Sequence, residues 1–155
     1  MFQSVQQMQE TPLNGKRINI RVSEGKLVNG GLFSASYLLF RIKTEPVSYS
    51  INRKDQDFYF LRKMLVKFFP YMIVPPLPIK KKKESEKTIK RREKYLTRFL
   101  SAVCRAEEFK SYPFLIEFLK NDDIKEFQKI MKNEDKKKFV RKMENVISPQ
   151  GRVPA

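Results

Sequence analysis

The chain has 155 residues and a formal net charge of +16, from 33 Lys and Arg against 17 Asp and Glu. It has no His and one Cys, Cys104, which excludes a histidine-based catalytic group, an intrachain disulfide and the usual zinc site. So large an excess of positive charge predicts a polyanionic partner, either nucleic acid, an acidic membrane or an acidic protein.

The N-terminal third predicts a small sheet that follows a disordered tail at residues 1–14. Alternating apolar and polar residues indicate strands within residues 17–25, 35–44 and 46–54. The Asn29-Gly30-Gly31 run and Pro46 mark the breaks between them. Sequential strands joined by short connections favour an antiparallel meander.

The apolar spacing then changes to that of helices. Residues 55–70 predict a helix with Asp55 as its cap and Pro70 as its stop. Further helices are predicted from about residue 84 to 106, over residues 111–121 and, more weakly, over 122–147, before a disordered tail at 148–155. The predicted fold class is α+β, with a three-stranded antiparallel sheet packed against a helical subdomain and a proline-rich loop between helices.

That loop places three prolines directly before four lysines, in the sequence VPPLPIKKKK. A polyproline ligand for a partner is one interpretation, and a structural connector that packs on the core is the favoured one. Between Lys80 and Arg98 the chain has ten basic and three acidic residues, so a purely solvated helix face does not explain the imbalance. Each cation near an anionic bilayer contributes about 1 kcal/mol, which makes a membrane surface a suitable partner.

Three motifs in order resemble those of the PX domain, the phosphoinositide-binding module of sorting nexins. NRKDQDF matches the basic segment that ends in an acidic residue and Phe, PPLPIK matches the proline-rich motif that ends in Lys, and RREKYLTRFL matches the Arg-rich helix start. The resemblance implies a PX-like domain over residues 15–121.

The resemblance also implies a headgroup site. Lys54 holds the position of the Arg that grips the 3-phosphate, Lys80 matches the Lys that contacts the 1-phosphate, and Arg92 matches the Arg that binds ring hydroxyls. Arg53 matches the first basic residue, which in the family is more often structural than ligating, and it is included among the headgroup candidates. Nonspecific membrane contact is assigned to Lys81, Lys82, Lys83 and Lys87.

The implied function is membrane recruitment through phosphatidylinositol 3-phosphate or a related phosphoinositide, on the cytosolic face of endosomal membranes. Two residues depart from the family pattern, because Lys54 replaces an Arg and Asp55 replaces an aromatic residue. Since Arg and Lys are not interchangeable at a phosphate, an alternative stays open. It is a degenerate PX fold that serves protein interaction or assembly and binds acidic lipid only nonspecifically.

Other classes of function are disfavoured by the sequence. No glycine-rich phosphate loop or nucleophile–base pair indicates an enzyme, and no residue pattern indicates a metal or cofactor. Nucleic acid is disfavoured because the aromatic residues follow core positions. No apolar run approaches the roughly 18 residues of a membrane span, so we expect a cytoplasmic, peripheral protein. The helix at 122–147 is left as a packing element, the start of a dimerisation domain, a membrane-surface helix or a contact for protein partners.

Overall fold

The sheet has the predicted antiparallel order. The computed structural model describes residues 10–32, 34–79 and 85–138, and within these the strands pair in the order β1-β2-β3. One buried row crosses all three strands, because Val22 pairs with Ile42 and Ile42 pairs with Ile51. The strands are β1 (Asn19–Val28), β2 (Tyr37–Glu45) and β3 (Tyr49–Lys54).

A bulge in β1 lets a helix approach the edge of the sheet. The register of β1 against β2 shifts between Ser23 and Lys26, and Glu24 in this bulge has φ +53°. A Cβ added to Gly25 would lie 2.6 Å from a ring carbon of Phe40 and 2.7 Å from a methyl carbon of Ile89. Glycine is therefore required here by space rather than by a positive φ.

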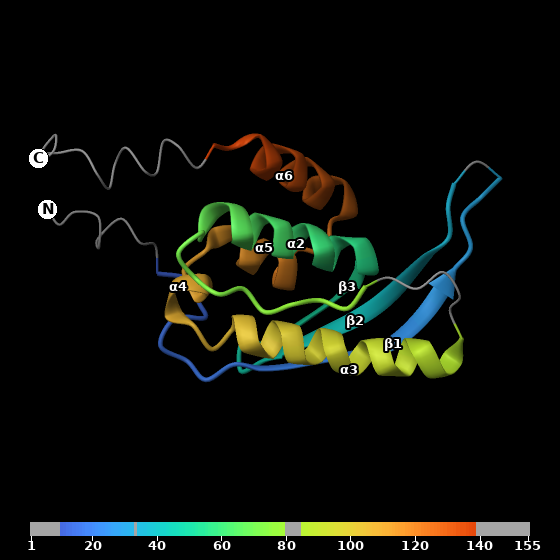
Figure 1. Cartoon of the computed structure of the whole chain (residues 1–155), viewed down its shortest axis with the longest axis horizontal. Helices are drawn as coiled ribbons and strands as arrows, with labels where there is room; N and C mark the ends of the chain where they lie inside the picture. Colours follow the sequence, from blue (N-terminus) through green and yellow to red (C-terminus); the bar gives the residue numbers. More distant parts are fainter. Residues whose placement is uncertain (1–9, 33, 80–84, 139–155) are drawn as a thin grey trace, which may run out of the picture.

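The helices form layers on both sides of the sheet region. In Figure 1, α6 lies at the top, α2 and α5 lie beneath it, and α3 runs along β1 at the bottom. The helices are α2 (Asp55–Phe68), α3 (Glu86–Val103), α4 (Glu107–Lys110), α5 (Pro113–Lys120) and α6 (Ile124–Lys136). The predicted α+β class is thus confirmed, while the four-residue helix α4 was not predicted.

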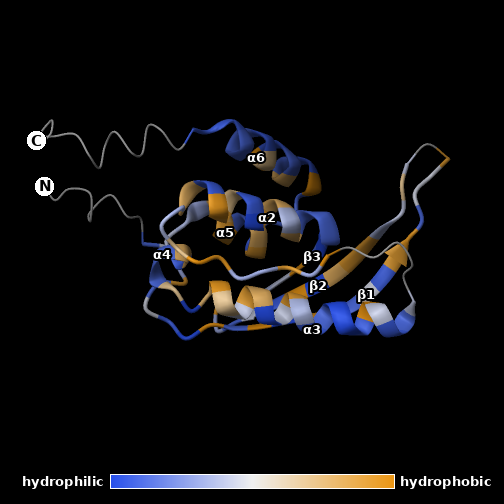
Figure 2. Ribbon diagram, viewed as in Figure 1, coloured by the Kyte–Doolittle hydropathy of each residue, from blue (hydrophilic) through white to orange (hydrophobic). Residues whose placement is uncertain are grey.

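The core is rich in phenylalanine and lies between the sheet and the helices, where apolar residues line the inner sides of the elements (Figure 2). Phe58 is fully buried and meets Phe40 and Phe118 edge-on, with ring centroids 6.2 and 5.2 Å away. Edge-to-face aromatic pairs add about 0.5–1.5 kcal/mol beyond their burial. Burial raises the pKa of the Cys104 thiol to about 12, as expected for a small core residue without a reactive role.

Several boundaries differ from the predictions by a few residues, and long-range contacts explain the changes at the start of α2 and in the N-terminal tail. Helix α2 is capped by Lys54 rather than by Asp55, because the Asp57 side chain reaches back to accept a hydrogen bond of 3.0 Å from the Lys54 amide. The predicted tail also ends earlier than residue 14, since Leu13 is fully buried and Asn14 donates to a carboxylate oxygen of Glu107. These contacts join residues more than 90 positions apart, which no local pattern reveals.

Helix α6 packs on the domain through buried aromatic and polar side chains. Phe127 is buried and stacks on Phe114, with ring centroids 5.8 Å apart. Glu134 is also buried and accepts a 2.5 Å hydrogen bond from the Tyr112 hydroxyl. Helix α6 is therefore a packing element, and it ends at Lys136, before the predicted end at residue 147, because Lys137 is extended; residues 139–155 lie outside the described residues.

Candidate functional site

A cavity of about 260 Å³ lies between the end of the proline loop and the first turns of α3. From α3 come Thr88, Arg91, Arg92 and Tyr95, and from the loop come Pro78 and Ile79. The positive end of the α3 dipole adds to the charge of the two arginines, so the cavity favours an anion. Its mixed lining of cations, a hydroxyl and apolar surface suits a phosphorylated polar ring.

The proline loop is held in place by two side chains of α2. The Tyr59 hydroxyl donates a hydrogen bond to the Pro78 carbonyl, and Arg62 Nε donates to the Pro75 carbonyl at 2.8 Å. Prolines supply no backbone donor but keep their carbonyls as acceptors. The loop is therefore a rigid rim of the cavity. Neither anchor was predicted, because both residues look like ordinary half-exposed positions of an amphipathic helix.

Arg92 is the predicted site residue that the structure places in the cavity wall. Its side chain is only 6% exposed, and its Nη1 lies 3.9 Å from Oδ2 of Asp55. This ion pair brings the start of α2 against the second turn of α3. Because the two groups are nearly buried, the carboxylate offsets part of the charge that Arg92 offers to an anion.

Lys54 lies at the same junction, as the last residue of β3 and the neighbour of Asp55. It is half-buried, and its Nζ lies 4.4 Å from the ring centroid of Tyr37 at the start of β2. This is cation–π geometry. The structure thus places an aromatic ring beside Lys54, although the sequence has Asp where the family has its aromatic residue.

Arg53, the fourth headgroup candidate, points away from this junction into the core. It is 3% exposed, and it donates hydrogen bonds to the backbone carbonyls of Asn52, Glu117, Phe118 and Asn121. Its guanidinium carbon also lies 3.7 Å from the ring centroid of Phe127. Burial lowers the pKa of Arg53 to about 10, with nearby carboxylates opposing the shift. We therefore correct the assignment of Arg53 from headgroup binding to a structural link between β3 and α5.

The outer face of α3 keeps the predicted positive charge. Lys87, Lys90 and Lys94 are exposed, whereas Glu93 is half-buried and accepts a hydrogen bond of 2.8 Å from the Gly25 amide. Glu93 is thus directed towards β1. Because Arg92 and Glu93 are both turned inward, the surface that solvent meets keeps the net positive charge that the sequence predicts. Lys80, Lys81, Lys82 and Lys83 lie outside the described residues.

Two exposed apolar side chains accompany this basic surface. Ile79 at the cavity rim is 88% exposed, and Leu32 in the β1–β2 connection is 92% exposed. Figure 1 shows the β1–β2 connection and the start of α3 at the same end of the molecule. Leu32 was not predicted to be exposed, because a single apolar residue in a glycine-containing turn has no distinctive pattern.

Comparison with known proteins identifies the family of the chain. A family model of the PX domain matches residues 43–122, which is half of the chain. The chain belongs to the PX domain family. Proteins described as sorting nexin-4, from two strains of Cryptococcus neoformans var. neoformans serotype D, are 30% identical to it over 125 residues. The match covers 71% of this chain and 25% of each relative, so the chain spans about a quarter of their length.

Two further findings concern what the described residues lack. No helix within residues 10–32, 34–79 and 85–138 is long and apolar enough to cross a membrane. The same part of the PX domain contains no cluster of Cys, Asp and Glu able to hold a metal ion.

Proposed function

We propose that this PX domain binds a phosphoinositide headgroup in the cavity beside Arg92 and recruits its protein to the cytosolic face of endosomal membranes. The observation that supports it most is the placement of a nearly buried arginine in a cavity whose rim ends at the lysine run. A phosphate that enters the cavity can form charge-assisted hydrogen bonds with such a cation. The preferred ligand is phosphatidylinositol 3-phosphate or a related phosphoinositide.

Within this proposal, the cations have two roles. Arg92, Lys54 and Lys80 contact the headgroup, while Lys87 and the lysines at 81–83 meet the surrounding acidic lipid. Ile79 and Leu32, which are both exposed at the same end, enter the interfacial region of the bilayer. The first set gives selectivity, whereas the second gives affinity that falls with rising salt.

Liposome co-sedimentation tests the proposal. Vesicles with phosphatidylinositol 3-phosphate are compared with vesicles of equal negative charge made from phosphatidylserine. We expect Arg92→Gln to remove the preference for the phosphoinositide, by about tenfold or more, because hydrogen bonds to charged groups are worth about 1.5–3 kcal/mol. Arg98→Gln is the matched control, since Arg98 is exposed on the same helix and outside this cavity.

The Arg92 variant also removes a partner of buried Asp55, so a second variant separates folding from binding. The double change Arg92→Gln with Asp55→Asn removes both charges together and leaves a neutral pair. We expect it to unfold at a denaturant concentration near that of the wild type and still lack the preference. Equal binding of both vesicle types by the wild type would refute the headgroup site.

One observation favours the second function, a degenerate PX fold with only nonspecific lipid binding. The Asp55 carboxylate lies 3.9 Å from Nη1 of Arg92, so it already pairs with the positive charge that a phosphate would otherwise bind. If the protein has this second function, the wild type binds acidic lipid by charge alone, and Asp55→Asn creates a phosphoinositide preference. A preference already present in the wild type, unchanged by Asp55→Asn, would exclude it.

A further inference from the structure

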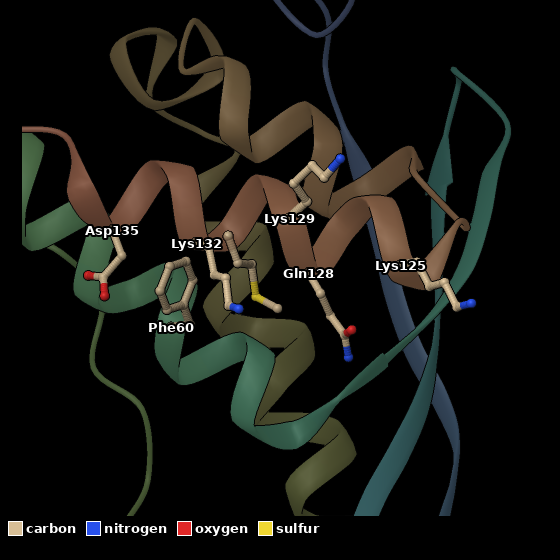
Figure 3. A pocket seen from close by; sticks show the side chains of 7 residues that line it. Phe60, Lys125, Gln128, Lys129, Lys132 and Asp135 are labelled. Atoms are coloured by element: carbon tan, nitrogen blue, oxygen red, sulfur yellow. The ribbon is translucent and has the colours of Figure 1, made fainter.

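A second groove, of about 560 Å³, lies between α6 and α2, away from the cavity beside Arg92. Figure 3 shows Phe60 of α2 facing α6, and Lys132 and Gln128 projecting from α6 on the same side. Phe60 and Met131 are half-buried and give the groove an apolar floor. We call this the α2–α6 groove, lined by Phe60, Lys125, Gln128, Lys129, Met131, Lys132 and Asp135.

The groove is basic around its apolar floor. Lys125, Lys129 and Lys132 are all exposed, and none of them forms an ion pair with another described residue. The one acidic residue of the lining, Asp135, lies 3.5 Å from Nζ of Lys63, which offsets its charge. The groove therefore offers three uncompensated cations beside an apolar surface.

The groove is separate from the proposed lipid site. The PX family model ends at residue 122, whereas α6 begins at Ile124, so the helix that builds the groove lies outside the family match. In Figure 1, α6 and α3 lie on opposite sides of the molecule, with α2 between them. A membrane surface that meets the basic face of α3 is therefore not the natural partner of α6.

Charge also argues against occupants from the chain itself. Residues 139–155 contain three basic residues and one acidic residue, and residues 1–9 contain no charged side chain. A second copy of the chain would carry the same charge of +16. The C-terminal residues and a second copy carry a net positive charge, which the lysines of the groove would repel. The N-terminal residues carry no negative side chain that could pair with these lysines.

We propose that the α2–α6 groove binds an acidic segment of a partner protein through carboxylates on either side of a large apolar side chain. The apolar side chain lies on Phe60 and Met131, and the carboxylates pair with Lys125, Lys129 and Lys132. From residue 125 to 132 a helix rises about 10 Å. An extended peptide covers that length in about three or four residues, so acidic residues three or four positions apart match the lysines.

Fluorescence anisotropy with a labelled peptide tests the proposal. The probe is a ten-residue peptide of Glu and Asp with one central Phe, and the second probe has Ser in place of Phe. We expect the triple variant Lys125→Glu, Lys129→Glu and Lys132→Glu to weaken binding of the first probe by at least about tenfold at low salt. We also expect the Ser probe to bind the wild type several-fold more weakly, because it lacks the apolar anchor.

A matched control changes the net charge equally at another place. Lys16, Lys26 and Lys43 are exposed lysines of the N-terminal turn, β1 and β2, and their change to Glu should leave binding within about twofold. Equal loss in both triple variants, or equal binding of the two probes, would overturn the proposal in favour of nonspecific charge.

A vesicle measurement distinguishes a membrane from a protein partner. Phosphatidylserine vesicles are added in place of the peptide. If the Lys125, Lys129 and Lys132 variant loses vesicle binding but keeps peptide binding, the groove is a membrane surface and the proposal is wrong. Loss of peptide binding with vesicle binding kept supports it, and neither result depends on the headgroup site.

Discussion

Replacing Arg53 should weaken the fold without affecting the headgroup site directly. In Arg53→Lys, one ammonium replaces a guanidinium that donates to the carbonyls of Glu117 and Phe118 at 2.9 Å and to two other carbonyls. Because a single Nζ cannot follow the fork of the guanidinium, at least two of these bonds are lost, each worth about 1.5–3 kcal/mol. The stacking on the Phe127 ring, worth about 1 kcal/mol, is lost as well.

The net loss is smaller than the sum of these contributions. Burial already disfavours the charged form of Arg53, as its lowered pKa of about 10 shows, and water can reach some of the freed carbonyls. We therefore expect the free energy of unfolding to fall by about 3 kcal/mol, a large share of the roughly 5–15 kcal/mol that stabilises a domain. A domain of this size should then lose about 6–12 °C in its melting temperature.

Urea unfolding followed by circular dichroism measures this loss, and Lys54→Met is the matched control. Lys54 is half-buried and makes a cation–π contact with Tyr37, so its replacement should cost less than about 1 kcal/mol. Vesicle binding, compared at equal folded fraction, should be reduced by the Lys54 change and not by the Arg53 change. Wild-type stability of Arg53→Lys together with lost lipid preference would refute the structural assignment.

Three further predictions concern other parts of the domain. Gly25→Ala should lower the unfolding free energy by about 1–3 kcal/mol in urea titrations, because the new methyl group meets the buried Phe40 ring. Hydrogen bonds to Glu107, the strongest from the Gly15 amide at 2.9 Å, lower its pKa to about 2, so the Gly15 amide shift should titrate near pH 2 in NMR spectra. The stabilisation from this carboxylate is full above its ordinary pKa of 4.5 and is lost as the pH falls through 2. Tyr112→Phe should cost about 1.5–3 kcal/mol by calorimetry, since it removes a hydrogen bond to a buried carboxylate of α6.

Controls for these predictions come from the same chain. Gly31→Ala meets no atom within 4 Å and should change stability by less than about 0.5 kcal/mol, so an equal effect at both glycines would contradict the steric reasoning. Glu107→Gln should abolish the titration of the Gly15 amide shift near pH 2. A titration midpoint near pH 4.5 in the wild type would show that Glu107 does not accept the hydrogen bond from the Gly15 amide. A Tyr112 variant as stable as the wild type would show that the hydrogen bond between Tyr112 and Glu134 does not stabilise the packing of α6.

Much of the fold could be predicted from local periodicity. The three strands and helices α2, α3, α5 and α6 each have a periodic pattern of apolar residues. Such a pattern indicates the type of element when it extends over several residues. Helix α4 has four residues, which is too short for a period, and the turn ending at Gly15 depends on contacts with Glu107. An element that is stabilised by residues distant in the sequence cannot be predicted from the pattern of its neighbouring residues.

The site was predictable to a smaller degree. Strand alternation predicts that neighbouring residues such as Arg53 and Lys54 point to opposite faces, but it does not decide which face is the core. The resemblance to the PX family identified Arg92, which the structure places in a cavity. The Asp55 partner of Arg92 and the loop anchors Tyr59 and Arg62 come from contacts between helices and a loop, whose geometry the sequence alone does not give.

The docking of α3 on β1 has a consequence for behaviour at a crowded surface. Thr97 and Glu93 accept hydrogen bonds from the Val22 and Gly25 amides, so the outer edge of β1 is already occupied by side chains of the helix that carries Arg92. An open strand edge is a template for pairing between molecules, and concentration on a membrane would promote such pairing. Release of α3 would therefore dismantle the proposed headgroup site and expose an aggregation-prone strand edge in one event, so the solubility of the protein and the integrity of that site depend on the same contacts.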